Sequence, residues 1–218
     1  MAWAHSDERG RGLDRAITFS DGVFAIAITL LVLSFRLPQV AAHGADSHLL
    51  DALTDESGTF VGFVVSFYVI ARFWMTHHRL SIWLRHVDST FVALNLVFLA
   101  SVVFLPFPTE VLGVYGSTKT AVVFYGLAMT VTGVLSTAVW QYASSRGLMD
   151  PRLTAAWRRA GWVRGLSVPV VFASSIPIAF VSTSVAQYWW ILLVLQRGVG
   201  RRWLPGRDEP FGRPARTG

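Results

Sequence analysis

Asp21 is an acidic residue inside an apolar segment of membrane length that runs from Ala16 to Leu33. A carboxylate in hydrocarbon costs about 2.5–3.5 kcal/mol on insertion scales, so intramembrane acids usually face a helix bundle, a partner or a water-filled path. Asp21 can therefore contact a permeating cation or proton, or it can accept hydrogen bonds that lock neighbouring helices. Either role makes it a candidate functional residue.

Other polar side chains are expected at the membrane depth of Asp21, roughly 9 Å into its helix at 1.5 Å per residue. The next apolar segment returns across the membrane and ends near two histidines, and the third segment begins at the same side. We predict a polar network at this end of the first three helices, in which Asp21 and Ser20 meet Arg15 or a histidine. Its expected members are Arg15, Phe19, Ser20, Asp21, Trp74, His77, His78 and Asn95.

The adjacent histidines do not predict a metal site. His77 and His78 point about 100° apart on a helix, so both cannot ligate one ion without distortion of the backbone. The chain has no cysteine, which excludes thiolate ligands and disulfides. Proton sensing by a histidine is chemically reasonable, but a hydrogen-bonding anchor is the more common role. No catalytic triad order, phosphate loop or carboxylate pair is present, so neither an enzyme nor a cofactor is predicted.

The composition indicates that lipid is the solvent for most of the chain. Hydrophobic residues make up 53% and charged residues 15% of the sequence, and the mean hydropathy is +0.47. A bilayer core needs about 20 apolar residues per helix. Six segments meet or approach this length, which predicts an all-α membrane protein with a tight hairpin between the last two helices. They are 16–36, 57–76, 88–107, 117–142, 162–181 and 184–197.

Arginines are concentrated in alternate connections between these segments, which predicts the orientation through the positive-inside rule. Both termini are expected in the cytoplasm of a multi-pass cell-membrane protein. The net charge of +6 is then topological and requires no nucleic-acid partner. We expect a cytoplasmic N-terminus at 1–14, a transmembrane domain at 15–198, and a basic tail at 199–218 that contacts membrane lipids.

Several long motifs resemble the prokaryotic relatives of the endolysosomal potassium channel, the transmembrane protein 175 family. The resemblance runs from Arg15 to about Ala143, and the motifs recur in order. They are Arg15-x-x-x-Phe19-Ser20-Asp21-Gly22-Val23-Phe24-Ala25-Ile26-Ala27-Ile28-Thr29-Leu30-Leu31-Val32-Leu33, then Trp74-x-x-His77-His78-Arg79-Leu80, then Asp88, Asn95-Leu96, and Leu105-Pro106-Phe107-Pro108-Thr109. The resemblance implies a homotetramer in which four copies of the first helix line a potassium-conducting pore. Such a pore has no carbonyl filter, and this sequence shows no filter-like glycine-tyrosine-glycine loop.

One face of the first helix has the spacing that such a pore needs. The residues of this face recur at intervals of three and four: Gly22, Ala25, Ile26, Thr29, Leu30 and Leu33. By itself the pattern fits lipid contact as well as pore lining. The resemblance matches Ile26, Leu30 and Leu33 to pore-lining positions, with Ile26 at the narrowest point. Four copies would form apolar rings that can gate by dewetting and a Thr29 ring of oxygen ligands for transient potassium, while Leu31 is expected to face lipid.

The outer end of the first helix departs from the family pattern. Ser34 stands where relatives often carry an acidic residue, and Arg36 follows it. A positive ring there would oppose cation entry unless nearby acidic residues offset it. The candidates for this are Asp46, Asp51, Asp55 and Glu56.

Two other functions remain open at this stage. A proton- or cation-coupled secondary transporter would also use intramembrane acids, but it would normally show internal repeats and helices broken near the midplane. The only prolines in the middle of a predicted helix are Pro169 and Pro177 of the fifth segment. A non-conducting membrane scaffold would explain the polar network without any pore.

Overall fold

The computed structural model describes residues 2–35, 53–54, 57–193 and 195. Over these residues the protein is helical. The elements are α1 (Ala2–Leu30), a short 3-10 turn η1 (Leu31–Ser34), α3 (Ser57–Trp83), α4 (Ser89–Phe104), α5 (Pro106–Tyr115), α6 (Lys119–Ser145), α7 (Ala155–Val181) and α8 (Thr183–Trp189).

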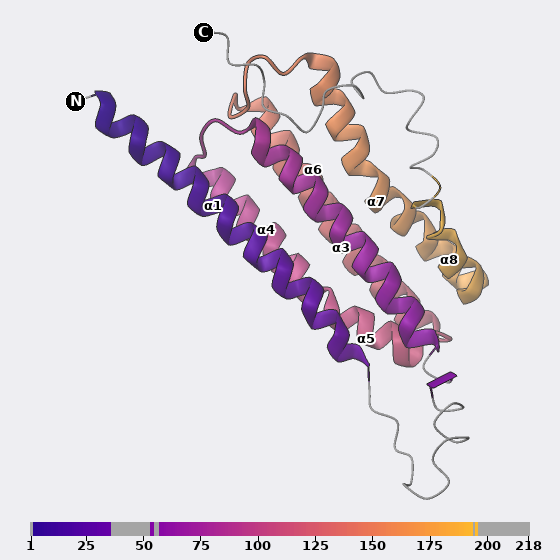
Figure 1. The fold of residues 1–218 in the computed structure, drawn as a ribbon. Helices are drawn as coiled ribbons and strands as arrows, with labels where there is room; N and C mark the ends of the chain where they lie inside the picture. The colour runs from indigo at the N-terminus through magenta and orange to yellow at the C-terminus, as the bar shows by residue number, and fades with distance from the viewer. Residues whose placement is uncertain (1, 36–52, 55–56, 194, 196–218) are drawn as a thin grey trace, which may run out of the picture.

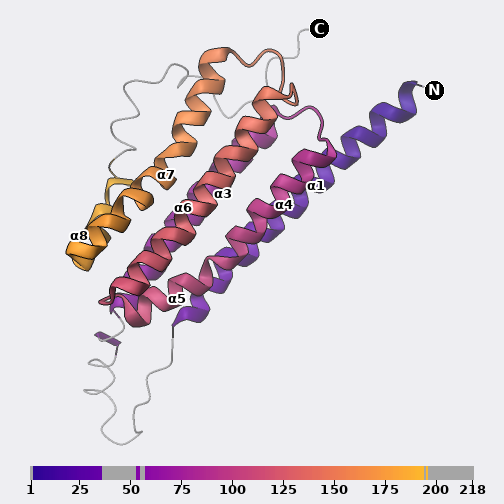
Figure 2. The ribbon, with the colours of Figure 1, turned by 180° about the vertical axis from the view of Figure 1, so that it is seen from behind.

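The long helices run roughly alongside one another (Figures 1 and 2). α1 and α4 form one edge of the bundle, α3 and α6 lie in the middle, and α7 with α8 forms the other edge. The N-terminal part of α1 is continuous with the rest of that helix and projects beyond the bundle (Figure 1). Residues 2–14 thus continue the first span as helix, and their expected cytoplasmic location stays a prediction.

Five helical segments in the described part of the chain are long and apolar enough to cross a membrane. They confirm an all-α membrane protein and match the first five predicted segments. They are Gly12–Ser34, Ser57–Trp83, Ser89–Tyr115, Lys119–Ser145 and Ala155–Val181.

The sixth segment, expected at 184–197, differs from the prediction. Its described residues are 184–193 and 195. The seven-residue helix α8 is shorter than a membrane span, and helix resumes at 192 after a turn at 190–191. Ser182 caps the start of α8 by accepting a hydrogen bond from the Val185 amide, 3.4 Å away. The helix then ends in a tighter turn, in which the Trp190 amide donates to the Gln187 carbonyl. Residues 194 and 196–218, including the predicted tail, lie outside the described residues.

Proline breaks the third span into two helices. Pro106 and Pro108 occupy the first turn of α5, where a missing amide hydrogen is tolerated. Because the proline ring clashes with the preceding helical turn, α4 ends before Leu105. α5 then crosses close to the start of α3. A Cβ added to Gly113 would lie 3.2 Å from the Cα of Thr59, so glycine permits this approach.

α6 and α7 pack closely along a seam that is lined by small residues. A Cβ on Gly133 would lie 2.6 Å from the ring of Pro169, and one on Gly165 would lie 2.9 Å from the Thr137 hydroxyl. A Cβ on Gly161 would overlap the indole of Trp140. Small residues at helix seams are typical of membrane proteins, where close van der Waals contact drives association.

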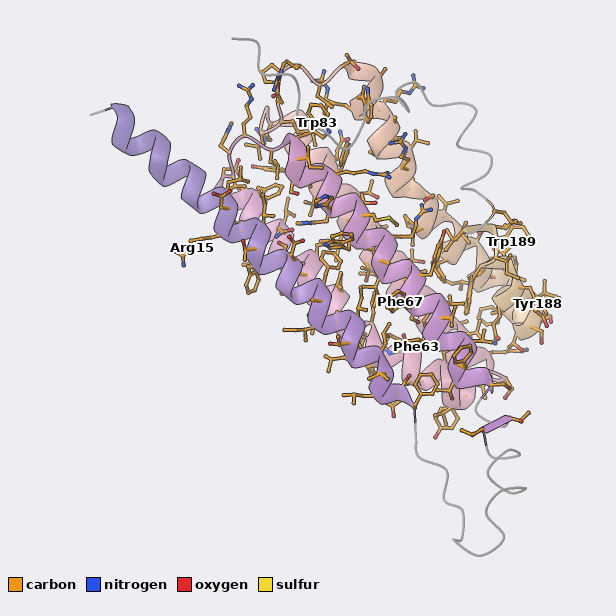
Figure 3. All side chains as sticks on the ribbon, in the orientation of Figure 1. Arg15, Phe63, Phe67, Trp83, Tyr188 and Trp189 are labelled. Carbon is orange, nitrogen blue, oxygen red and sulfur yellow. The ribbon has the colours of Figure 1, made fainter. Side chains whose placement is uncertain are left out.

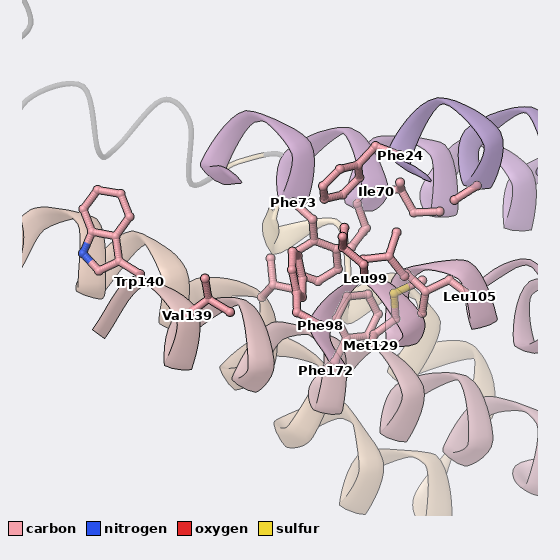
Figure 4. Packing of buried hydrophobic residues seen from close by; sticks show 14 of the residues in the cluster. Phe24, Ile70, Phe73, Phe98, Leu99, Leu105, Met129, Val139, Trp140 and Phe172 are labelled. Atoms are coloured by element: carbon pink, nitrogen blue, oxygen red, sulfur yellow. The ribbon is translucent and has the colours of Figure 1, made fainter. Parts of the chain in front are cut away.

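Aromatic side chains fill the centre of the bundle (Figure 4). Phe98 of α4 contacts Phe24 of α1 and Phe73 of α3, with ring centroids 5.9 Å and 6.2 Å away. Tyr125 of α6 packs against Trp190, with centroids 4.9 Å apart. Trp140 lies apart from this centre, toward the other end of α6 (Figure 4).

Two loops are tied together at the end of the bundle where α3 and α6 finish. Leu84 and Met149 form an antiparallel bridge, and the Asp150 amide donates to the Trp83 carbonyl across 2.8 Å. The Asp150 carboxylate also pairs with Arg152 at 2.7 Å and Arg85 at 3.0 Å. The hydrogen bonds from Arg152, with a smaller contribution from Arg85, hold the pKa of Asp150 well below its usual range.

Candidate polar network and outward face of the first helix

Three of the predicted network residues form one buried chain of hydrogen bonds. Asn95 of α4 donates its side-chain amide to the Ser20 hydroxyl of α1 across 3.0 Å. The Asn95 carbonyl oxygen lies 2.9 Å from Nε2 of His77 in α3. Ser20, His77 and Asn95 are each at most 6% exposed. The chain therefore links α1, α4 and α3 inside the bundle.

The donors and acceptors in this chain of hydrogen bonds can be assigned from Ser20, at one end of it. Ser20 donates its single hydroxyl hydrogen to the Ala16 carbonyl at 2.8 Å, so its oxygen accepts from the Asn95 amide. The Asn95 carbonyl then faces His77, whose Nε2 carries the hydrogen. Nδ1 of His77 is buried and has no hydrogen-bond partner among the described residues. The imidazole also stacks on Phe98, with centroids 6.1 Å apart.

Asp21 belongs to a second, more exposed contact. Its carboxylate accepts a hydrogen bond from the indole Nε1 of Trp74 across 3.0 Å, and His78 stacks on that indole with centroids 5.2 Å apart. Asp21 is half-buried, and Trp74 is 37% exposed. The two histidines thus face different neighbours, as the helical spacing predicts, and Asp21 contacts an indole where Arg15 or a histidine was expected.

Arg15 and Phe19 lie outside both contacts in the single chain. The Arg15 side chain is exposed and points away from the other helices (Figure 3). Phe19 is 55% exposed. The structure therefore brings together Ser20, Asn95 and His77, and separately Asp21, Trp74 and His78.

The outward face of α1 consists of Gly22, Ala25, Ile26, Thr29, Leu30 and Leu33, and all six are exposed. Ile26 is 58% exposed and Leu33 70%, whereas Phe24, Ala27 and Leu31 on the opposite side are at most 1% exposed. The helix therefore uses one face for its own subunit and leaves the other uncovered. Leu31, expected to face lipid, is instead in the core because it lies seven residues, or two turns, after Phe24.

Two hydroxyls near the end of this helix bond to the backbone. Thr29 donates to the Ile26 carbonyl across 2.9 Å, so its lone pairs remain available on the outward face. Ser34 donates to the Leu31 carbonyl across 2.7 Å and is 4% exposed. Ser34 is thus turned toward its own subunit, and Arg36 with the four acidic residues considered above lies outside the described residues.

A third polar group was not found by inspection of the sequence. The hydroxyls of Ser66 and Tyr125 lie 2.9 Å apart, and that of Thr109 lies 2.8 Å from Ser66. The three side chains come from α3, α5 and α6, and all are buried. Hydroxyl residues within apolar segments were the only available signal, and spacing along the chain does not reveal which of them meet.

The fold and these contacts define a multi-pass helical membrane protein whose first span is fixed by polar contacts and leaves an apolar face uncovered. A family described as the endosomal/lysosomal potassium channel TMEM175 matches residues 15–106. A potassium channel of Streptomyces collinus is 33% identical over 199 residues, which cover 89% of this chain and 95% of that protein. The chain belongs to the TMEM175 family.

Other relatives agree with this assignment. The crystal structure of a lysosomal potassium-selective channel TMEM175 homolog from Chamaesiphon minutus aligns with a TM-score of 0.75 and 25% identity, covering 88% of this chain and 99% of that one. The endosomal/lysosomal proton channel TMEM175 of Gallus gallus is 33% identical over 98 residues, which are 43% of this chain and 20% of that protein.

Proposed function

We propose that this chain is the subunit of a passive, potassium-permeable cation channel with no cofactor. The main observation that supports this proposal is that α1 has one buried face and one uncovered apolar face. The related protein of Streptomyces collinus is named a potassium channel, and the solved homolog from Chamaesiphon minutus is described as potassium-selective. Both names support potassium as the permeant ion here.

The proposed assembly is a homotetramer in which four α1 helices surround the ion path. A closed ring would cover the outward face of α1 with copies of itself, as cyclic assemblies do. Ile26 would form the narrowest ring, and Leu30 and Leu33 would form further apolar rings toward the end of the helix. Gly22 would widen the path on the other side of Ile26. Such a constriction opens and closes by wetting and dewetting.

Thr29 would supply oxygen one turn from this constriction. Its hydrogen is committed to the Ile26 carbonyl, so the outward lone pairs can accept a cation but the hydroxyl has no hydrogen left to donate. Four such oxygens would replace part of the hydration shell of a potassium ion beside the Ile26 ring.

The polar contacts of Ser20 and Asp21 would hold α1 in place while ions pass its other face. They join α1 to α3 and α4 through hydrogen bonds of 3.0 Å. The arginine-rich end of the bundle, where α1 enters, is proposed to face the cytoplasm, which would place both termini there. The membrane would be the cell membrane, with lipids and the other three subunits as partners.

Ion flux into liposomes that contain the purified full-length chain tests the proposal. Potassium flux down its gradient, without coupling to protons or sodium, is expected from particles of about four subunits. Ile26→Asn should wet the constriction and raise sodium flux more than potassium flux. Its matched control is Val170→Asn on α7, at the opposite edge of the bundle, because both side chains are 58% exposed.

Four results would contradict the proposal. Flux that requires a proton or sodium gradient would indicate a coupled transporter, and absence of flux from well-formed oligomers would indicate a scaffold. Equal effects of Ile26→Asn and Val170→Asn would show that the outward face of α1 is not the ion path. A mass measurement that finds active monomers would exclude the tetrameric pore.

A further inference from the structure

The C-terminal half of the first span, residues 24–34, carries most of the proposed pore face and is held differently from the other half. Ser20 and Asp21 fix the N-terminal half through hydrogen bonds to α4 and α3. In the C-terminal half, Thr29 and Ser34 donate their hydroxyl hydrogens to carbonyls of their own segment. Helices in membranes are positioned by close packing and by hydrogen bonds between them. The position of residues 24–34 therefore depends on the elements that pack against them.

The end of this half packs against α5 and α3. The turn η1 contacts both helices, and α5 lies beside the C-terminal end of α1 (Figures 1 and 2). Leu31 of η1 is fully buried. Phe35, which follows η1, contacts Phe63 of α3 with ring centroids 5.3 Å apart. A change in the position of α5 would therefore reach η1 directly.

Small residues of α3 allow α5 to approach its backbone. Gly58, Gly62 and Ser66 recur every four residues along α3 and share one face. A Cβ added to Gly58 would lie 3.7 Å from the Gly113 carbonyl oxygen of α5, and one added to Gly62 would lie 3.9 Å from the Thr109 carbonyl oxygen. Ser66 takes the third position of this stripe, so its hydroxyl meets the first turns of α5.

Three buried hydroxyls join α5 to α3 and α6 at this point. The Thr109 hydroxyl oxygen lies 2.8 Å from both the Leu105 carbonyl and the Ser66 hydroxyl, and Ser66 lies 2.9 Å from the Tyr125 hydroxyl. A carbonyl oxygen only accepts, so the single hydrogen of Thr109 goes to Leu105. Ser66 then donates to Thr109, and Tyr125 donates to Ser66. Only this assignment makes all three contacts hydrogen bonds.

We propose that Ser66, Thr109 and Tyr125 are positioning residues for the ion path, an inference that rests on the proposed function. Their hydrogen bonds hold α5 against α3 and α6, and α5 holds η1, which carries Leu33 and directly follows Leu30. The three hydroxyls are at most 1% exposed, so water does not replace a lost bond. They thus fix the apolar rings at the end of α1 without contact with the permeating ion.

Hydrogen–deuterium exchange of the purified full-length chain in detergent tests the positioning of α1. Thr109→Val keeps the side-chain shape but removes the link to Ser66, and Tyr125→Phe removes the donor at the start of the chain. Each should raise exchange at residues 31–35 about threefold, the factor for one average hydrogen bond between membrane helices. Residues 16–21 should keep the wild-type rate, which separates a local release from general unfolding.

Ion flux into liposomes tests the effect on conduction. Apolar rings that are held less firmly should wet more readily, so both variants should raise the ratio of sodium to potassium flux by about the same factor. Thr109→Ser retains the hydroxyl and should keep the wild-type exchange and flux ratio. Thr132→Val is the matched control because Thr132 is also 1% exposed and donates to a carbonyl of its own helix, that of Ala128 at 2.9 Å. It should change neither measurement.

Several results would overturn the positioning role. Exchange at residues 31–35 that stays at the wild-type rate in Thr109→Val and Tyr125→Phe, or that rises equally throughout the chain, would exclude it. So would an unchanged flux ratio, a Thr109→Ser variant that behaves as Thr109→Val, or equal effects of Thr132→Val. Thr109→Val decides the result if Tyr125→Phe does not fold. Absence of flux in the wild type would overturn the proposed function instead, and exchange at residues 31–35 would still decide whether the hydroxyls position α1.

Discussion

The indole N–H of Trp74 donates to the carboxylate of Asp21 across 3.0 Å, and this contact joins α3 to α1. The hydrogen bond is charge-assisted and lies at the edge of the bundle, beside the stacked His78 ring. The indole N–H gives this intramembrane carboxylate a hydrogen-bond donor. The contact therefore helps to fix the position of α1 against α3.

Loss of this donor should weaken assembly. Trp74→Phe keeps an aromatic ring against His78 but removes the N–H, and it should lower the yield of oligomer in detergent as much as Asp21→Ala does. Arg15→Ala should have a smaller effect because Arg15 points away from this contact. Size-exclusion yield measures the result, with Trp162→Phe as control because that indole is similarly exposed at 42%. A loss confined to Arg15→Ala would mean that the carboxylate depends on Arg15 across a subunit boundary.

The buried chain of Ser20, Asn95 and His77 predicts an order of stabilities. Asn95→Leu removes the acceptor for the His77 N–H, whereas Ser20→Ala removes only the acceptor for one amide hydrogen of Asn95. Hydrogen bonds between membrane helices contribute about 0.6 kcal/mol on average and up to about 1.7 kcal/mol. Asn95→Leu should therefore lower the free energy of unfolding by about 1–2 kcal/mol, and Ser20→Ala by less. Unfolding in mixed micelles would measure both, and the reverse order would contradict the central position of Asn95 between His77 and Ser20.

A larger residue at the α6–α7 seam should destabilise the protein, and a second substitution should recover part of the lost stability. Gly161→Ala places a methyl group in the Trp140 indole, and overpacking of this kind typically costs about 1–3 kcal/mol. Trp140→Phe removes the overlapping part of the ring and should recover part of the loss in the double variant. Gly12→Ala is the control, since no heavy atom lies within 4 Å of its added Cβ. Additive losses in the double variant would show that the two residues do not meet.

The ion pairs of Asp150, which join two loops, should make the stability of the fold depend on pH in the acid range. Hydrogen bonds from Arg152 and Arg85 lower the pKa of Asp150 in the folded protein. Its contribution is therefore present above the unfolded pKa, about 3.9, and is lost as the pH falls from there through the folded pKa. The melting temperature of the wild type should fall below about pH 4 more steeply than that of Asp150→Asn. Asp14→Asn, which removes an exposed carboxylate of α1, should retain the steep dependence.

Some features of this fold can be predicted from the sequence, and others cannot. Apolar length identified five spans, and helical periodicity identified the uncovered face around Ile26, because both depend on local spacing. Depth in the membrane brought Ser20, His77 and Asn95 to one level. Partner identity depends on how helices rotate against each other, so the sequence did not reveal that Asp21 meets Trp74 or that Tyr125 meets Ser66. The prediction for Leu31 was wrong because an aliphatic side chain suits a lipid-facing position and a core position equally well.

Thr29 gives the sharpest test of the ion path because its hydroxyl can be removed without a change of shape. Thr29→Val deletes the only side-chain oxygen on the outward face of α1, so a potassium ion beside the Ile26 ring would lose four ligands in a tetramer. Potassium flux should fall while assembly is unchanged, and Thr29→Ser should restore it. Thr130→Val on α6 is the matched control, since Thr130 also donates to a carbonyl of its own helix, that of Gly126 at 2.6 Å. If Thr29→Val and Thr130→Val reduce the flux equally, the loss reflects helix stability, and the oxygens of Thr29 do not contact the permeating ion.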